Sequence, residues 1–228
     1  MPRSRGDDLT EDPDPGKLDA FEALVRGRRM CRAFRADPLD PTMVERILDL
    51  ARRAPSAGNT QPWSFLLLDS PKSVARYWDI TLPKPKRGTF PWPGLLDAPV
   101  LVLPCVTPAA YPHRYAEKDK LRRVAASNEG RAVLSAGVHG WDVPYWFVDG
   151  GMAIMNLLSC AEAAGLGALF FGLFAHEKAV SDAFSIPAEV QPLGTVALGW
   201  PARAGSRLAA STSRTRPPLG AILHRGGW

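Results

Sequence analysis

Hydrophobic side chains recur at intervals of three and four residues in several stretches of the chain, which places them on one face of a helix. One such face contains Val44, Ile47 and Ala51, and Thr42 with Glu45 fits a capping box at the start of the same helix. The pattern predicts helices at residues 18–27, 42–51, 72–78, 148–164 and 176–184. The helix at 148–164 is apolar on nearly every side, so we expect it at the centre of the molecule.

Short uninterrupted apolar runs predict buried strands at residues 63–68, 100–106, 168–171 and 195–198. Residues 81–99 contain five prolines, so we expect no regular element there. The polar segment 111–139 leaves two interpretations open, a helix broken near Gly130 or a mobile lid. Because helices and strands mix without a strict strand–helix–strand order, the pattern favours an α+β fold over a doubly wound α/β fold.

The composition indicates one globular domain of ordinary size. The chain has 228 residues, of which 46% are hydrophobic and 22% charged, enough apolar material for a core. The net charge is +5, and 21 of the 28 basic residues are arginine, the side chain that suits planar recognition of phosphate. The arginine excess fits either a phosphate-bearing ligand or a bias in genome composition.

The N-terminal residues and the cysteines indicate a reducing compartment. Residues 1–17 are acidic and proline-rich without the apolar stretch of a signal peptide, so we predict a disordered tail followed by a single domain at 18–228. Three separated cysteines without a CxxC pair do not predict a disulfide framework. Glu162 interrupts the longest apolar run, which is then too short to span a membrane. We therefore predict a cytoplasmic protein without a membrane partner.

Several common catalytic motifs do not occur in the sequence. Gly165 and Gly167 follow a helix instead of opening one, and Phe170 occupies the third position of the dinucleotide-binding pattern. His176 has Val180 where a zinc protease would have its second histidine, and the four histidines never show the spacing of metal ligands. We therefore predict no metal site, and we find no nucleophile paired with a base.

Two basic clusters could bind a phosphate. Arg28, Arg29 and Arg32 follow the first helix and could converge on one anion, although the helix dipole alone also favours cations at a helix C-terminus. Arg214 and Arg216 precede two prolines and could contact the other side of the same anion or belong to a charged tail.

Two further segments could contact a flat ring. In the loop 55–63, Asn59 and Gln61 offer both donors and acceptors, and small neighbours would let a pteridine or isoalloxazine ring approach the backbone. A capped turn between helix and strand explains the same loop equally well. The segment 170–174, FFGLF, could form a wall beside an aromatic ligand or an ordinary core strand.

Taken in order, these segments resemble the motifs of the nitroreductase family of FMN-dependent oxidoreductases. RRMCRAF is similar to the family's RRSxRxF motif, and APSAGNTQPW is similar to APSxxNxQPW. GGMAIMNLLSCAEAAGLG resembles the long core helix, FFGLF the segment beside the flavin, and SRTRPPLGAILHRGGW the basic C-terminal stretch. The resemblance extends from about Leu18 to Trp228. It implies an α+β homodimer with a mostly antiparallel central sheet flanked by helices, segments exchanged between subunits, and FMN at the dimer interface.

The resemblance also implies residue roles. Arg28, Arg32, Arg214 and Arg216 would hold the phosphate and ribityl chain or the pyrimidine edge of FMN. Asn59 and Gln61 would contact the ribityl and pyrimidine side, and Pro55, Ser56 and Ala57 would come from the partner subunit. Phe171, Gly172 and Leu173 would lie along the ring near N5. Met30 replaces the family's usual serine, so Arg29 or a backbone N–H would compensate for the lost hydroxyl, and Gly172 stands where some members have glutamate.

For the reaction, the resemblance implies a ping-pong exchange in which NAD(P)H reduces FMN and leaves before a nitroaromatic, quinone or related conjugated acceptor binds. A cation such as Arg32 would stabilise the negative charge that a flavin gains on reduction. The cofactor performs the chemistry, so no catalytic side chain is expected. Trp141, Tyr145 and Trp146 precede the core helix and either line the acceptor pocket or pack in the core.

Other functions remain open at this stage. Relatives with this fold fragment flavin, remove halogens or oxidise azolines, so the fold leaves the acceptor undetermined. The substitution at Met30 also fits a flavin-binding or redox-sensing protein without turnover. The cations are scattered and no nucleic-acid motif accompanies them, so nucleic acid is not an expected partner.

Overall fold

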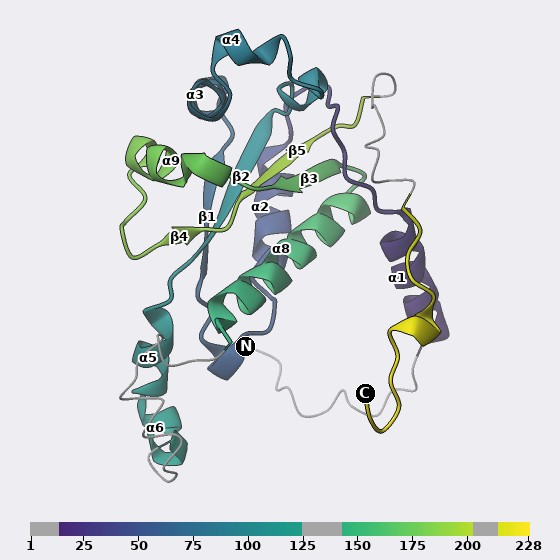
Figure 1. Ribbon diagram of the computed structural model, residues 1–228, viewed down its shortest axis with the longest axis vertical. Helices are drawn as coiled ribbons and strands as arrows, with labels where there is room; N and C mark the ends of the chain where they lie inside the picture. The colour runs from purple at the N-terminus through teal and green to yellow at the C-terminus, as the bar shows by residue number, and fades with distance from the viewer. Residues whose placement is uncertain (1–13, 125–142, 203–213) are drawn as a thin grey trace.

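The computed structural model describes residues 14–124, 143–202 and 214–228, and its centre is an antiparallel sheet (Figure 1). The strands are β1 (Trp63–Leu68), β2 (Val100–Val106), β3 (Gly167–Phe171), β4 (Gln191–Pro192) and β5 (Thr195–Gly199). Their order is β1-β2-β5-β3, β4 pairs with β2, and all these pairings are antiparallel. This sheet, with helices on both faces, confirms the predicted α+β class.

Strand β2 explains why its sequence is apolar without interruption. Val100 and Val102 belong to one buried cluster, whereas Leu101 and Leu103 belong to another. Successive side chains of a strand point to opposite faces of a sheet, so β2 contributes to a core on each side. All seven of its residues are accordingly buried.

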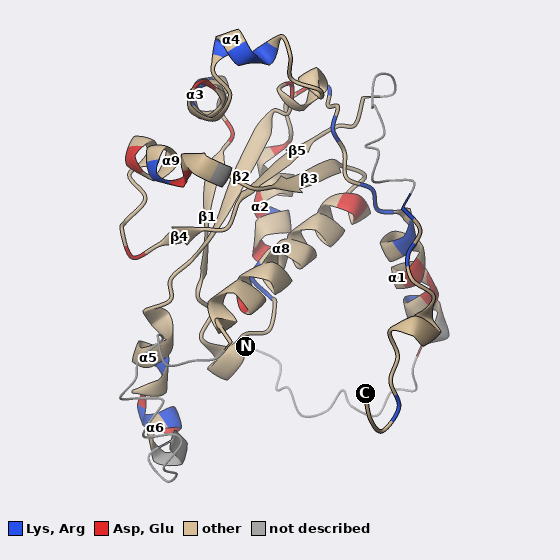
Figure 2. Ribbon diagram, in the orientation of Figure 1, with Lys and Arg blue, Asp and Glu red and all other residues tan. Residues whose placement is uncertain are grey.

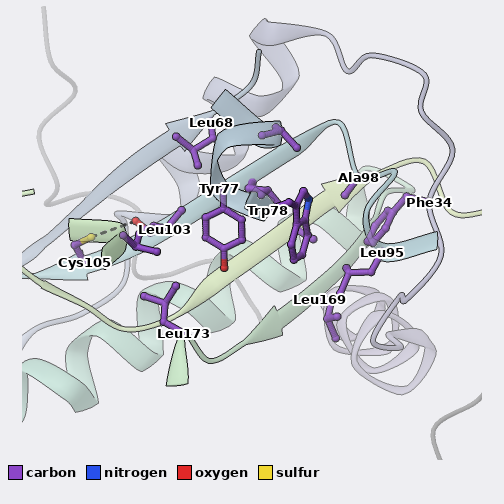
Figure 3. Close-up of a cluster of buried hydrophobic side chains, with 14 residues drawn as sticks. Phe34, Leu68, Tyr77, Trp78, Leu95, Ala98, Leu103, Cys105, Leu169 and Leu173 are labelled. Atoms are coloured by element: carbon purple, nitrogen blue, oxygen red, sulfur yellow. Dashed lines mark hydrogen bonds between the residues drawn. The ribbon is translucent and has the colours of Figure 1, made fainter. Parts of the chain in front are cut away.

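Two pairs of helices cover these faces. Helices α2 (Pro41–Ala51) and α8 (Tyr145–Ala163) pack together on one face, and α8 also contacts β1, β2 and β3. Helices α3 (Pro71–Thr81) and α9 (Glu177–Phe184) lie on the other face, where Tyr77 and Trp78 fill the cluster drawn in Figure 3. The position of α8 against three strands confirms the predicted central placement.

The remaining elements lie around this core. They are α1 (Pro15–Gly27), α4 (Lys84–Arg87), α5 (Ala110–Tyr115), α6 (Lys118–Val124) and the 3-10 turns η1 (Ala57–Asn59), η2 (Pro93–Leu95), η4 (Phe174–His176) and η6 (Leu219–Ala221). Helix α1 begins three residues inside the segment predicted as a tail, with Asp14 as its N-cap. Among the residues that the structure describes, no helix combines the length and the apolar character needed to cross a bilayer.

Three predictions about elements are wrong. Helix α2 has no Thr42–Glu45 capping box, because Asp40 is the N-cap and its carboxylate accepts the Thr42 backbone N–H at 2.9 Å. Residues 81–99 do contain helical turns, α4 and η2. Pro85 and Pro93 lie in the first turn of these elements, where proline has no hydrogen bond to lose. Helix α8 begins at Tyr145, before the expected Val148.

The segment 111–139 is partly described. Helices α5 and α6 occupy its first part, whereas residues 125–142 lie outside the described residues. The predicted break near Gly130 and the predicted acceptor residue Trp141 both lie in 125–142, outside the described residues.

Candidate functional site

The loop between α2 and β1 has an unusual backbone. Gly58, Asn59 and Gln61 have backbone φ angles of 64°, 56° and 53°, in the left-handed region that residues other than glycine rarely adopt. The Gln61 N–H donates to Ser56 Oγ at 2.9 Å, which closes the loop on itself. Such conformations persist only where surrounding contacts enforce them, and they gather at ligand sites.

The two amide side chains of this loop are joined and face solvent. Gln61 Nε2 donates to Asn59 Oδ1 at 3.1 Å, and both residues are exposed. Within the described part of the chain, Asn59 Nδ2 and Gln61 Oε1 have no hydrogen-bond partner. The loop therefore presents an amide NH₂ and an amide oxygen side by side, which complements a ring edge that carries both acceptors and donors.

Side chains of two other elements, α8 and α5, form hydrogen bonds to the backbone of this loop. Asp149 Oδ2, on α8, accepts the Ala57 N–H at 2.9 Å and the Tyr111 hydroxyl at 2.5 Å. Arg114 Nε, on α5, donates to the Gly58 carbonyl at 3.0 Å. The sequence did not predict these residues, although a carboxylate near the start of a largely apolar helix was a signal for Asp149.

The pKa of Tyr111 and the pKa of Asp119, a partner of Arg114, are both shifted by their surroundings. Burial, reinforced by the hydrogen bond to Asp149, raises the pKa of Tyr111, so its hydroxyl remains a donor. The Arg114 guanidinium also pairs with Glu117 and Asp119, and its hydrogen bond to Asp119 lowers the pKa of that carboxyl to about 2.

The arginine cluster begins where α1 ends, and its backbone is attached to β3. Met30 forms a bridge with Ala168, and the Cys31 N–H donates to the Ala168 carbonyl at 2.9 Å. Arg29 Nη1 donates to the carbonyls of Arg26 and Gly27, so this guanidinium caps α1.

Arg28 and Arg32 differ from Arg29. The Nε of Arg28 is buried without a hydrogen-bond partner in the described residues. Arg32 lies over the Trp92 ring, 5.4 Å from its centroid, and its Nη1 donates to the Met30 carbonyl at 3.3 Å. A buried guanidinium nitrogen without an acceptor is costly, so Arg28 is suited to an anionic ligand.

The loop and the arginines lie at opposite ends of α8. Asp149 contacts the loop near the start of α8, whereas Gly27, next to the arginines, lies beside Glu162 near its end. These two positions are 13 helical residues apart, or about 20 Å at the rise of an α-helix. Figure 1 shows α8 crossing the sheet between these regions. One chain therefore does not bring Asn59 and Gln61 together with Arg28.

Phe171 and Leu173 pack their side chains in the core cluster on the α3 and α9 face of the sheet. The Phe171 ring stacks on Trp78, with centroids 5.9 Å apart and planes at 4°. The Leu173 side chain is 3% exposed in the core cluster of Figure 3, and Gly172 between them is half-buried.

The other predicted site residues are placed as follows. Arg214 and Arg216 are exposed in the C-terminal segment 214–228, which extends away from the sheet (Figure 1). Tyr145 is exposed, whereas Trp146 is half-buried against Tyr111, with ring centroids 6.4 Å apart. Trp146 thus packs at the same end of α8 as the loop.

Comparison with known proteins shows which family this chain resembles in sequence. The sequence profile of the Nitroreductase family matches residues 25–200, which is more than half of the chain. The chain belongs to the nitroreductase family. The matched region includes the arginine cluster, the loop and the whole sheet, and it confirms the resemblance noted from the motifs.

Individual relatives agree with this family. The chain is 29% identical to an NADH dehydrogenase of Thermus thermophilus over 204 residues, covering 82% of this chain and 89% of the relative. Shorter matches include a 5,6-dimethylbenzimidazole synthase of Rhodospirillum rubrum, 48% identical over 56 residues that cover 25% of this chain and 26% of the relative. A 4-nitrobenzoate reductase of Pseudomonas putida is 47% identical over 57 residues, covering 25% of each chain.

Solved structures confirm the nitroreductase fold. A protein from Exiguobacterium sibiricum, solved in complex with FMN, superposes with a TM-score of 0.64 and 20% identity, covering 90% of this chain and 96% of that one. Family and relatives together identify the chain as an oxidoreductase of the nitroreductase family. In the described residues, no group of three or more His, Cys, Asp or Glu is placed to hold a metal ion.

Proposed function

We propose that the protein is an FMN-dependent oxidoreductase that passes electrons from NAD(P)H to a nitroaromatic, quinone or related conjugated acceptor. The observation that carries the proposal is that the Nε of Arg28 finds no acceptor in the described residues, because a guanidinium without a protein partner there suits a phosphate. The exposed amides of Asn59 and Gln61 supply a second, neutral set of contacts that fits the donors and acceptors of a flavin ring edge. FMN carries both a phosphate and such an edge, so the residues fit this cofactor.

We further propose that the working unit is a homodimer. The arginines and the loop are about 20 Å apart along α8, so one end from each of two chains would complete a site. Exposed apolar side chains support a large contact with a second copy. They lie on α1, on α8 and in the C-terminal segment: Leu18, Phe21, Val25, Val148, Met155, Leu219, Ile222, Leu223 and Trp228.

Residue roles follow from this arrangement. Arg28 would bind the phosphate, and Arg32, Arg214 and Arg216 would contact the phosphate, the ribityl chain or the pyrimidine edge. Asn59 and Gln61, on the loop of Pro55, Ser56 and Ala57, would contact the flavin from the other chain. The backbone of residues 171–173 would line the ring. Arg29 fits a structural role better, because its guanidinium caps α1.

Bound FMN would supply the hydride chemistry, so the chain itself needs to bind and orient rather than to act as acid or base. NAD(P)H and the acceptor would occupy the same ring face in turn, a ping-pong order. Tyr145 and Trp146 would contact the acceptor, because they lie at the loop end of α8.

Purification followed by a visible spectrum and mass identification of the released chromophore tests the proposal. We expect a yellow protein that releases FMN and oxidises NAD(P)H when a quinone or a nitroaromatic is added. A folded protein that is colourless and does not bind added FMN would contradict it.

A second candidate is the fragmentation of flavin that some relatives with this fold perform; the observation that favours a reaction other than electron transfer to an acceptor is the local match to a protein named 5,6-dimethylbenzimidazole synthase. This candidate predicts that reduced FMN is consumed in air at a rate proportional to the enzyme concentration. Stoichiometric recovery of FMN after many turnovers would exclude this candidate and leave the first.

A further inference from the structure

Asp149 is a buried carboxylate in an apolar environment. It is 1% exposed, and Asp149 and Glu162 are the only charged residues of α8, whose ribbon is otherwise tan in Figure 2. A charge in such a place is unfavourable unless hydrogen bonds compensate for the lost water. Two donors within the described residues do so, and both reach the same oxygen, Oδ2.

One of these donors is the backbone N–H of Ala57, 92 residues away in the sequence. Ala57 begins the turn η1, and the residues directly after it have positive φ angles. The carboxylate therefore fixes the first residue of a turn whose unusual backbone sets the direction of the Asn59 and Gln61 amides.

The other donor orients the carboxylate. Tyr111 is fully buried, and its hydroxyl donates at 2.5 Å, the length of a strong hydrogen bond to a charged acceptor. Because burial raises the pKa of Tyr111, this donor is retained across the pH range of assays.

We propose that Asp149 is a positioning residue that holds the loop 55–61 in the shape that binds flavin, and that Tyr111 aims its carboxylate at Ala57. The proposal rests on the proposed function, because FMN is taken as the ligand of the loop. Asp149 acts only through Ala57 and does not touch the cofactor.

Three variants separate geometry from charge. Asp149→Asn keeps an oxygen that can accept from Ala57 and Tyr111 but removes the charge, whereas Asp149→Leu removes the acceptor. Tyr111→Phe removes only the orienting hydroxyl. Tyr77→Phe is the matched control, because Tyr77 is also fully buried and its hydroxyl bonds to Thr195 at 2.7 Å, away from the loop.

The first readout is the FMN dissociation constant, measured by flavin fluorescence on protein whose fold is checked by circular dichroism. We expect Asp149→Leu to weaken FMN binding about 30-fold and Tyr111→Phe about fivefold, whereas Asp149→Asn and Tyr77→Phe should weaken it by less than twofold. If Asp149→Leu does not fold, Tyr111→Phe against Tyr77→Phe still tests the proposal.

The second readout needs no flavin. Hydrogen exchange at the Ala57 amide should be slow in the wild type and in Asp149→Asn, and at least tenfold faster in Asp149→Leu. Unchanged FMN affinity in Asp149→Leu and Tyr111→Phe would overturn the proposal, as would equal losses in Asp149→Asn and Asp149→Leu. If the wild type binds no FMN, the proposed function fails instead.

Discussion

The two ends of α8 are built by different means. At its start, side chains from α5 and α8 hold the loop backbone through Ala57 and Gly58, so that neutral amides face solvent. At its end, the backbone of Met30 and Cys31 is fixed against β3, and the buried Nε of Arg28 has no acceptor among the residues that the structure describes. One end suits the polar edge of a ring and the other suits an anion. In the proposed function each end is half of a site, and a second copy of the chain supplies the other half.

The largest expected effect comes from the anion-binding end, which contains Arg28. Arg28→Glu should weaken FMN binding about 100-fold, because it removes charge-assisted hydrogen bonds to the phosphate and adds repulsion. Flavin fluorescence titration measures this change. Arg46→Glu, on the exposed surface of α2, is the matched charge reversal and should leave the affinity within twofold.

The neutral half should matter less. Asn59→Ala combined with Gln61→Ala should weaken FMN binding about tenfold, because neutral hydrogen bonds contribute less than charged ones. The same titration measures it, alongside the free energy of unfolding of the apoprotein. A loss larger than that of Arg28→Glu would reverse the ranking of the two ends.

The strained turn provides a smaller test of the loop end. Gly58 has a φ of 64°, and an added Cβ would lie 3.0 Å from the Tyr115 hydroxyl. Gly58→Ala should therefore lower the free energy of unfolding by about 1 kcal/mol, measured by urea denaturation. Gly88→Ala is the control, since nothing lies within 4 Å of its added Cβ. Equal changes in both variants would show that the turn carries no strain.

The smallest effect concerns Arg114 and pH. The pKa of Asp119 is lowered to about 2 by its hydrogen bond with Arg114, so the pair stabilises the fold above the ordinary aspartate pKa of about 4. This stabilisation should disappear as the pH falls from about 4 through about 2. Comparing the melting temperatures of the wild type and Asp119→Asn between pH 6 and pH 2 measures it. A difference that is as large at pH 2 as at pH 6 would contradict the assignment.

Much of the fold could be predicted from the sequence because the determining pattern is local. The apolar runs predicted the bounds of β1 and β2 to within a residue or two. The helical spacing of Val44, Ile47 and Ala51 did the same for α2. The errors arose where one side chain decides a boundary. Asp40, rather than Thr42, caps α2, and prolines in residues 81–99 start helical turns instead of preventing them.

The site was less predictable because its contacts are distant in sequence. Motif order indicated the family, which the profile match confirms over residues 25–200. No local pattern could show that Asp149 accepts from Ala57, or that the loop and the arginines lie at opposite ends of one helix. The roles of Arg28, Asn59 and Gln61 stay predictions until binding is measured.

Complementation between two chains that are each weakened in FMN binding tests the shared site most directly. One chain carries Arg28→Glu and the other carries Asn59→Ala with Gln61→Ala, and the mixed dimer is isolated with two different affinity tags. If each site takes one end from each chain, the mixed dimer contains one undamaged site and should bind one FMN with wild-type affinity. If the site lies within a single chain, both sites remain damaged, and the mixed dimer would bind FMN no better than either parent.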